Sequence, residues 1–271
     1  MPPKSTPEIP AFRRRLIRWF RRHGRDLPWR RTRDPYQVLV SEFMLQQTQV
    51  SRVEAYYRNF LSQYPTIQDL AHATPDRVRE SWQGLGYYRR AANLHLLART
   101  VVDQHGGAVP ADPEHLLKLP GVGRYTAGAV ASFAFERAVP TVDTNIARVI
   151  RRAFHPRRPK NPNDKVVWAT AARLVPARGA TAWVFNQGIM ELGALVCTAR
   201  IAKCGVCPVA AVCKTGKAER GERREEKPKI NGGQPRGRVL LSKPTRSLRN
   251  SGERRVERGP AAVLRYHRVM E

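Results

Sequence analysis

Apolar residues recur at helical intervals along most of the 271-residue chain. Residues 8–24 combine arginines with one apolar face, which predicts an amphipathic helix. The apolar positions of that face are Phe12, Leu16, Ile17 and Phe20. From about residue 36 to 154, further helical segments are separated by short breakers such as Tyr-Pro-Thr, Gly-Leu-Gly and His-Gly-Gly. More helices are expected over about 163–176 and 181–196, and no convincing alternating strand interrupts them, so the pattern predicts an all-α protein.

The stretch LVSEFMLQQTQV, residues 39–50, has the composition of a buried helix, with no Gly or Pro to interrupt it. At helical spacing Glu42 shares its face with Val38, Leu39 and Leu45, so a carboxyl group stands where the pattern predicts burial. Three glutamines follow it at positions 46, 47 and 49. Their amides donate and accept hydrogen bonds, as nucleotide bases require of a partner.

The formal net charge of +27 comes from 49 Lys and Arg against 22 Asp and Glu. Residues 215–271 contribute +9, so the first 214 residues carry +18 and are basic in their own right. This excess favours nucleic acid as the partner; the alternatives are a generally basic protein and a protein with a ribosomal or membrane-surface role. The 41% of hydrophobic residues indicates a globular chain, and no segment resembles a membrane span or a signal peptide. We therefore expect a cytoplasmic protein with no membrane partner.

All four cysteines lie within 17 residues, in the order C-x6-C-x2-C-x5-C; they are Cys197, Cys204, Cys207 and Cys213. Disulfides are a poor explanation in a chain with no export signal. Four thiolates can hold either zinc or an iron–sulfur cluster. Four-cysteine zinc sites usually contain two C-x2-C pairs, whereas this run has one, so the spacing favours the cluster.

The segment LPGVGRYTAGAVASFAF, residues 119–135, places a Gly-Val-Gly turn before an Ala-rich helix. Such a helix–hairpin–helix can hold a DNA phosphate through main-chain N–H groups, although a plain helix–helix turn is the simpler alternative. Downstream, Asp143 follows an apolar run and precedes a new helix, with Asn145 close behind it. On sequence alone, capping of that helix is the simplest role for Asp143. The histidines show no ligand spacing.

Together these motifs resemble the endonuclease III superfamily of helix–hairpin–helix DNA glycosylases, and most closely its adenine glycosylase (MutY-type) branch. The resemblance covers about residues 10–214, in the order LPWR, SEFMLQQTQV, WQGLGYYRRAANLH, LPGVGRYTAGAVAS, VDTNIARVIRR, NQGIMELGALVCT and the four cysteines. It implies a six-helix subdomain over 29–138 that contains the helix–hairpin–helix. It also implies a [4Fe–4S] cluster subdomain built from 8–28 and 139–214, across a DNA-binding cleft. We expect a basic linker over 215–257, and in 258–271 the start of a truncated C-terminal domain.

The resemblance also implies catalytic roles. Glu42 matches the general acid that protonates the departing adenine, a role that an apolar environment suits because desolvation raises a carboxyl pKa. Asp143 matches the carboxylate that stabilises the oxocarbenium-like sugar or bonds to it transiently. Asn145 and Tyr125 stand at positions that orient this chemistry. Tyr125 replaces the lysine of the strand-cutting branch, so the resemblance implies a monofunctional enzyme.

DNA contacts are implied for a second group: Gln46, Gln47, Thr48, Tyr87, Gly121, Val122 and Gly123. The hairpin residues would hold phosphate, while Gln47 and Tyr87 would enter the base stack and fill the space of a flipped nucleotide. The alternatives are a solvated helix end for Gln47 and a buried aromatic for Tyr87. The family's usual Asp-Gly-Asn is Asp-Thr-Asn here, which places the Thr144 side chain where a glycine normally stands.

The sequence thus predicts a monomeric base-excision-repair glycosylase, associated with the bacterial nucleoid, that acts on double-stranded DNA with a mismatched or oxidised base pair. Its expected reaction hydrolyses the N-glycosidic bond of adenine opposite 8-oxoguanine or guanine. The alternatives are a mismatch thymine glycosylase of the same superfamily and a non-catalytic iron–sulfur DNA-binding protein. The LQQTQV motif favours the adenine branch, and the presence of both Glu42 and Asp143 argues against a protein without catalysis.

Overall fold

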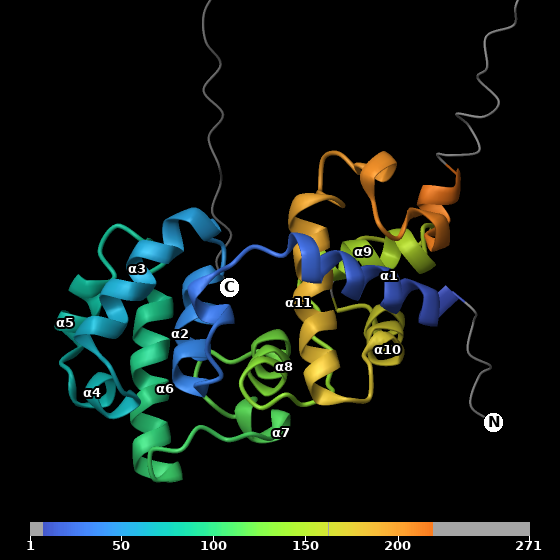
Figure 1. Ribbon diagram of the computed structural model, residues 1–271. Helices are drawn as coiled ribbons and strands as arrows, with labels where there is room; N and C mark the ends of the chain where they lie inside the picture. The colour runs from blue at the N-terminus through green and yellow to red at the C-terminus, as the bar shows by residue number, and fades with distance from the viewer. Residues whose placement is uncertain (1–7, 162, 219–271) are drawn as a thin grey trace, which may run out of the picture. The chain divides into compact units, whose positions relative to one another are not determined.

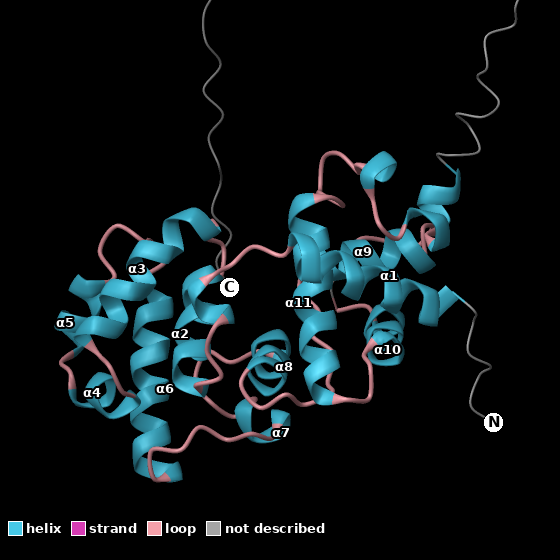
Figure 2. Cartoon of the chain, viewed as in Figure 1, coloured by secondary structure: helices cyan, strands magenta, loops and turns pink. Residues whose placement is uncertain are grey.

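A computed structural model describes residues 8–161 and 163–218 of the chain. Within these ranges the protein is helical, as Figure 2 shows; no strand occurs there, and the one isolated antiparallel bridge joins Cys197 to Ala202. The all-α prediction is confirmed. No helix of the described part is both long and apolar enough to cross a membrane. The predictions for residues 219–257 of the linker and for 258–271 lie outside the described residues.

The helices follow one another closely along the chain (Figure 1). The α-helices are α1 (Glu8–His23), α2 (Pro35–Leu45), α3 (Val50–Gln63), α4 (Ile67–His72), α5 (Pro75–Ser81), α6 (Arg89–His105), α7 (Pro113–Leu116), α8 (Arg124–Phe133), α9 (Thr144–Phe154), α10 (Lys165–Leu174) and α11 (Gly179–Leu195). Short 3-10 helices are η1 (Pro28–Arg30), η2 (Cys204–Val206) and η3 (Ala210–Val212). The segment 29–138 thus contains six longer α-helices and the four-residue α7.

Side-chain caps explain where many helices begin. The N-cap residues Asp34, Thr66, Thr74, Asp112, Asp143 and Asp164 each accept a hydrogen bond from a backbone N–H of the first turn. At α4 the cap is reciprocal, since Asp69 also accepts from the N–H of Thr66. Each such cap typically stabilises a helix by about 1 kcal/mol. The helix starts are therefore encoded locally.

The interpretation of residues 39–50 as one helix is wrong in its second half. Helix α2 ends at Leu45, and α3 begins at Val50. Between them Gln47 has a left-handed backbone, with φ of +59°. The guanidinium of Arg90, on α6, donates to the carbonyls of Phe43 and Met44 and so satisfies the end of α2 without Gly or Pro.

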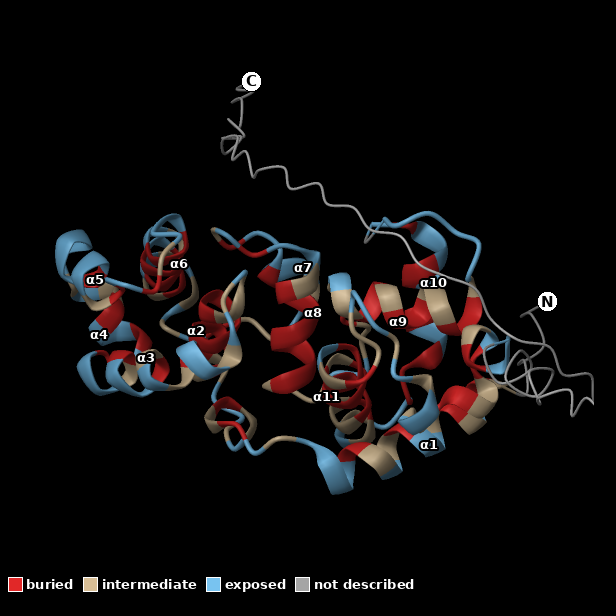
Figure 3. Ribbon diagram, turned by 90° about the horizontal axis from the view of Figure 1, so that it is seen from above, coloured by how far each residue is buried: buried red, intermediate tan, exposed pale blue. Residues whose placement is uncertain are grey.

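Buried hydrophobic side chains form two clusters in the described part. One runs from Leu27 to Phe133 and fills the space among α2 to α8. The other joins Ile9, Phe12 and Leu16 of α1 to side chains between residues 142 and 213. Figure 3 shows the buried faces of these helices turned towards their neighbours. The two clusters agree with a body whose second half includes the N-terminal helix; the exact subdomain boundaries stay a prediction.

Helix packing brings the candidate residues into reach of one another. Helix α2 packs against α3, α6 and α8, while α11 packs against α1, α8 and α9. Glu42 lies on α2, Tyr125 in the first turn of α8, and Asp143 at the start of α9. Elements distant in sequence therefore meet where these three side chains stand.

Candidate active site and DNA-binding surface

Glu42 lies within the apolar face of α2, and only 4% of the residue is exposed. Burial raises the pKa of its carboxyl to about 7. A side-chain hydrogen bond with Tyr125 and the charge of Arg30 act in the opposite direction, and the nearby charge of Asp143 raises the pKa further. Near neutral pH a substantial fraction of the protein therefore has this carboxyl protonated and able to donate.

Asp143 is the N-cap of α9, as the simplest interpretation of the sequence has it. Its Oδ1 accepts from the N–H of Ile146 at 2.6 Å, and its Oδ2 accepts from Asn145 Nδ2 at 2.9 Å. Burial raises the pKa of Asp143, while these two hydrogen bonds and the charge of Arg148 lower it. The cap fixes the carboxylate beside Glu42, so capping and a second role are compatible.

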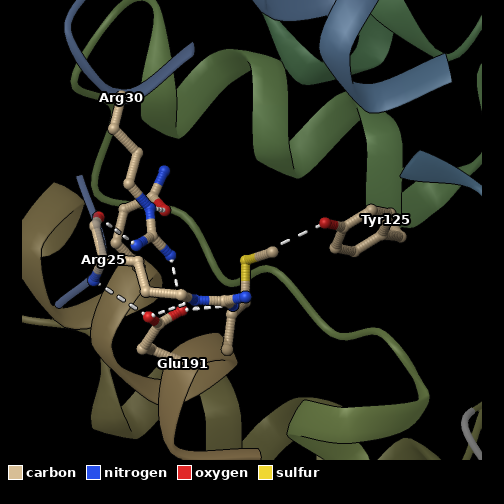
Figure 4. Close-up of polar contacts among 6 residues, drawn as sticks. Arg25, Arg30, Tyr125 and Glu191 are labelled. Carbon is tan, nitrogen blue, oxygen red and sulfur yellow. Dashed lines mark hydrogen bonds and ion pairs between the residues drawn. The ribbon is translucent and has the colours of Figure 1, made fainter. Parts of the chain in front are cut away.

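Tyr125 lies close enough to Glu42 and Asp143 for both of their charges to act on it. Its hydroxyl lies 3.8 Å from Met190 Sδ on α11, and Figure 4 shows the ring reaching from α8 towards that helix. Burial raises the pKa of Tyr125 well above its ordinary value, and the charges of Glu42 and Asp143 raise it further. The phenol therefore stays protonated and can act as a hydrogen-bond donor.

Arg148, one turn into α9, was not singled out from the sequence. It donates to Asn145 Oδ1 at 2.8 Å and to the carbonyls of Gly193 and Cys197 at 2.8 Å each. The Asp143–Asn145 pair is thereby tied to the end of α11 and to the first cysteine. The sequence signal that could have identified Arg148 is its position three residues after Asn145, because that spacing places the two side chains on one face of a helix.

Thr144 fits its position without strain. It is the first residue of α9, its side chain is exposed, and it is absent from the left-handed conformations of the described chain, which outside glycine are Gln47, Tyr87 and Glu136. The Asp-Thr-Asn sequence therefore forms the same helix start that a glycine would allow. Beside it a cavity is lined by Thr144, Arg148, Arg151, Arg152 and Lys160, which makes the surface next to Asp143 basic.

The hairpin between α7 and α8 has the expected form. Gly121 has φ of +75°, and a Cβ there would lie 2.8 Å from Asn93 Cβ and 3.0 Å from the ring of Phe43. Val122 is buried beneath the turn, whereas Gly123, the N-cap of α8, is exposed and has open space where its Cβ would be. No side chain caps α8, so the N–H groups of its first turn face outward.

Two exposed turns carry the residues expected to enter DNA. Gln47 and Tyr87 are both exposed, and both have left-handed backbones, with φ of +59° and +52°. The Tyr87 side chain is one of the exposed large hydrophobic groups, with 57% of the residue accessible, so the alternative of a buried aromatic is wrong. Gln46 and Thr48 flank Gln47 and are partly buried, since both bind Arg90.

The four cysteines together line one cavity with apolar walls. Its apolar lining includes Val149, Leu192, Val196 and Val209. Arg152 donates to Cys197 Sγ at 3.4 Å, and the N–H of Gly216 donates to Cys213 Sγ at 3.4 Å. In the described chain no group of three or more His, Cys, Asp or Glu side chains is arranged to hold a single metal ion.

A buried ion-pair network, absent from the sequence predictions, lies near the site. Glu191 of α11 accepts from the side chains of Arg25 and Arg30, at 2.8 and 2.9 Å, as Figure 4 shows. Burial alone would raise the pKa of Glu191, but the hydrogen bonds from the two arginines lower it to about 2. Arg30 also donates to Gln187. The network holds the connection from α1 to α2 against α11.

Comparison with known proteins shows which family the chain matches. Residues 40–177 match the family described as HhH-GPD superfamily base excision DNA repair protein. The chain is 45% identical over 223 residues to the adenine DNA glycosylase of Homo sapiens, across 78% of this chain and 40% of the human protein. It is 46% identical over 196 residues to the adenine DNA glycosylase of Mycolicibacterium smegmatis, across 72% of this chain and 66% of that protein. The chain thus spans from 40% to 66% of the length of these curated relatives.

Solved structures show the same fold. A thermostable thymine-DNA glycosylase superposes with a TM-score of 0.73 at 33% identity, covering 78% of this chain and 97% of that one. A trapped endonuclease III–DNA covalent intermediate superposes with a TM-score of 0.66 at 26% identity, covering 79% of this chain and 97% of that one.

Proposed function

Because the chain belongs to the HhH-GPD superfamily of base excision DNA repair proteins, we propose that it is a monofunctional DNA glycosylase that removes adenine mispaired with 8-oxoguanine or guanine. The observation that carries the proposal is the buried Glu42, whose pKa is raised to about 7 beside Asp143 and Tyr125. A glutamate with only a structural role does not require a raised pKa. A general acid that protonates a leaving base must hold a proton near neutral pH.

In the proposed reaction Glu42 donates its proton to a ring nitrogen of the extruded adenine as the bond between base and sugar breaks. The electron pair of that bond leaves with the base, and positive charge develops on the sugar. Asp143, held by Asn145 and the N–H of Ile146, offsets this charge until water adds to the sugar carbon and gives a proton back to the Glu42 carboxylate. Fixing the carboxylate in advance lowers the barrier, because no reorientation is needed during the reaction.

Tyr125 supports base release without strand cleavage. Its phenol stays protonated and offers a hydrogen bond to Glu42, but it carries no amine to form a Schiff base with the sugar. We propose that it orients the acid and that the strand is left intact.

Double-stranded DNA is the proposed partner. The first turn of α8, preceded by Gly121 and Gly123, offers main-chain N–H groups to a phosphate. The basic cavity lined by Arg148, Arg151 and Lys160 continues a cationic surface beside Asp143. Gln47 and Tyr87 protrude and would occupy the space that an extruded base leaves.

The four cysteines fit a [4Fe–4S] cluster better than a single zinc ion. A four-cysteine zinc site usually contains two C-x2-C pairs, whereas Cys204 and Cys207 form one such pair here, and all four thiols line the walls of a single cavity. Apolar walls and N–H donors to sulfur are the surroundings such clusters have. When bound, the cluster would serve as a structural crosslink that fixes residues 197–213. Cys197, Cys204, Cys207 and Cys213 would hold it.

A thymine glycosylase is the second candidate, because a thymine-DNA glycosylase is among the structures that superpose well. The higher identity to adenine glycosylases favours adenine. The two are separated by single-turnover excision on duplexes with A opposite 8-oxoguanine, A opposite G, T opposite G, and A opposite T. We expect release from the first two only, and none from Glu42→Gln. Excision of T from the T–G duplex with no excision of adenine would overturn the proposal.

A further inference from the structure

Arg90 is a buried cation that the proposed chemistry does not use. Only 6% of the residue is exposed, and no salt bridge to a carboxylate is found for it in the described part of the chain. Burial lowers the pKa of its guanidinium. A buried charge without a counter-ion is costly, so its surroundings must supply other compensation.

That compensation comes from main-chain oxygens of two separate turns. Nη1 donates to the carbonyls of Phe43 and Met44, at 3.0 and 2.7 Å, and to that of Gln46. Nη2 donates to Thr48 Oγ1 at 3.0 Å and to the carbonyl of Gly86 at 3.0 Å. One guanidinium thus joins the turn between α2 and α3 to the turn before α6.

These two turns carry the residues proposed to enter the base stack. Gln47 lies between Gln46 and Thr48, and Tyr87 directly follows Gly86. Both have left-handed backbones, a conformation that residues with a Cβ rarely hold without support from their surroundings. Arg90 also stacks against the aromatic ring of Tyr87, with its guanidinium carbon 5.2 Å from the ring centre.

We propose that Arg90 is a positioning residue that fixes the two turns at one spacing, so that Gln47 and Tyr87 enter the DNA as a pair. The planar fork makes this possible, because it directs several N–H groups at acceptors on different segments. A lysine at the same place has one small ammonium group and can satisfy one turn but not both. The inference rests on the proposed glycosylase function only for its DNA step.

The neighbouring Arg89 provides a matched control. It lies in the same first turn of α6, is exposed, and is not among the residues that donate hydrogen bonds to either turn. Arg89→Lys, Arg89→Met, Arg90→Lys and Arg90→Met can therefore be compared as two pairs with equal changes in charge. If Arg90→Met fails to fold, the comparison of Arg90→Lys with Arg89→Lys tests the proposal.

The first measurement is amide hydrogen exchange without DNA. In Arg90→Met the amides of residues 46–48 and 85–88 should together lose about tenfold in protection, and in Arg90→Lys the amides of at least one of these turns should, while both Arg89 variants behave as wild type. The proposal that Arg90 holds both turns would be contradicted if neither turn lost protection. It would also be contradicted if only one turn lost protection in Arg90→Met. This arm requires no assumption about substrate.

The second measurement uses duplexes that carry 2-aminopurine beside the mismatched adenine. The fluorescence of 2-aminopurine rises when the base stack opens. Wild type and both Arg89 variants should give the full rise, and Arg90→Lys less than a third of it, at unchanged affinity for undamaged duplex. A full rise from Arg90→Lys in which at least one turn is loosened would refute the positioning role. No rise from wild type would count against the proposed function instead, and the exchange result would still test Arg90.

Discussion

At the residue scale, burial sets the protonation of each acid, and hydrogen bonds then adjust it. Glu42 receives few compensating hydrogen bonds, so desolvation raises its pKa to about 7. Glu191 is as deeply buried, yet the two arginines that donate to it lower its pKa to about 2. One helical protein thus holds a carboxyl that is partly protonated near neutral pH and another that stays ionised until the pH falls to about 2.

The pKa of Glu42 predicts the pH dependence of base release. Since the protonated form is the active one, the single-turnover rate should fall as the pH rises above about 7. Tyr125→Phe removes a hydrogen bond that stabilises the ionised carboxylate, so the pKa should rise and the fall should move to higher pH. The measurement is the rate from pH 5.5 to 9 for both proteins. A fall at the same or lower pH in the variant would contradict this role for Tyr125.

Asp143→Asn separates a capping role from a catalytic one. Asparagine caps a helix about as well as aspartate, so the stability of the protein should change by less than about 1 kcal/mol. A neutral amide cannot offset the charge on the sugar, so excision should fall by about 10³-fold or more. Urea unfolding and single-turnover excision measure the two effects. A stable variant that excises adenine at the wild-type rate would leave capping as the whole account.

The residues that could be predicted from sequence are those whose signal is local. Glu42 interrupts an apolar helix face, and Asp143 precedes a helix, so each is visible within a few positions. The contacts of Arg90 with Phe43 and of Glu191 with Arg25 span 47 and 166 residues, and no local pattern marks them. The roles of Gln47 and Tyr87 came from the family resemblance, whereas their left-handed backbones are visible only in the fold.

At the element scale, the end of α2 shows how a distant residue overrides local preference. Nothing within residues 39–50 stops a helix, and the side chain that ends it comes from α6. The α7–α8 hairpin shows the reverse, because its glycines predict the turn that the structure has. Sequence patterns therefore located the helices and the hairpin better than the turn between α2 and α3.

The two hairpin glycines should respond differently to alanine. Gly121→Ala forces a left-handed alanine against Asn93, so the free energy of unfolding should fall by about 1–2 kcal/mol. Gly123→Ala meets no atom within 4 Å and should unfold as wild type. Its new methyl group would nevertheless occupy the open space where a phosphate would approach α8, so affinity for undamaged duplex should fall about tenfold, the loss of one charged hydrogen bond. Wild-type affinity of Gly123→Ala at equal salt would mean that no phosphate binds there.

At the scale of the whole described body, two hydrophobic clusters are joined by α11 and by the arginines that reach it. Arg25 and Arg30 lie in the connection between α1 and α2, and Glu191 anchors both. Because Arg30 is also buried, it depends on this carboxylate for its counter-charge. The geometry between the helix that carries Glu42 and the helices around Asp143 therefore depends on an ion pair outside the reaction.

Glu191→Gln should accordingly destabilise the protein as a whole. It leaves Arg30 with a buried charge and no carboxylate, at a cost of about 3 kcal/mol. The matched control is Glu136→Gln, whose pair with Arg33 is exposed on both sides and should contribute less than about 1 kcal/mol. Urea unfolding of the three proteins at pH 7 measures both effects. Equal losses in the two variants would show that the buried pair has no special role.

The pH dependence of this difference is a stricter test. The folded pKa of Glu191 is about 2 and lies below the ordinary value of 4.5, so its charge stabilises the fold fully above pH 4.5. As the pH falls from 4.5 towards 2 the unfolded chain takes up a proton that the folded protein resists, and the stabilisation is lost. The gap between wild type and Glu191→Gln should therefore be constant from pH 7 to 5 and shrink below 4.5. Glu42 has the opposite sign, since its raised pKa makes stability fall as the pH rises from 4.5 to 7. Glu42 is present in both proteins, so its contribution cancels in the comparison. A difference in the free energy of unfolding that stayed constant down to pH 3 would contradict the prediction. It would mean that Arg25 and Arg30 do not hold Glu191 as a carboxylate.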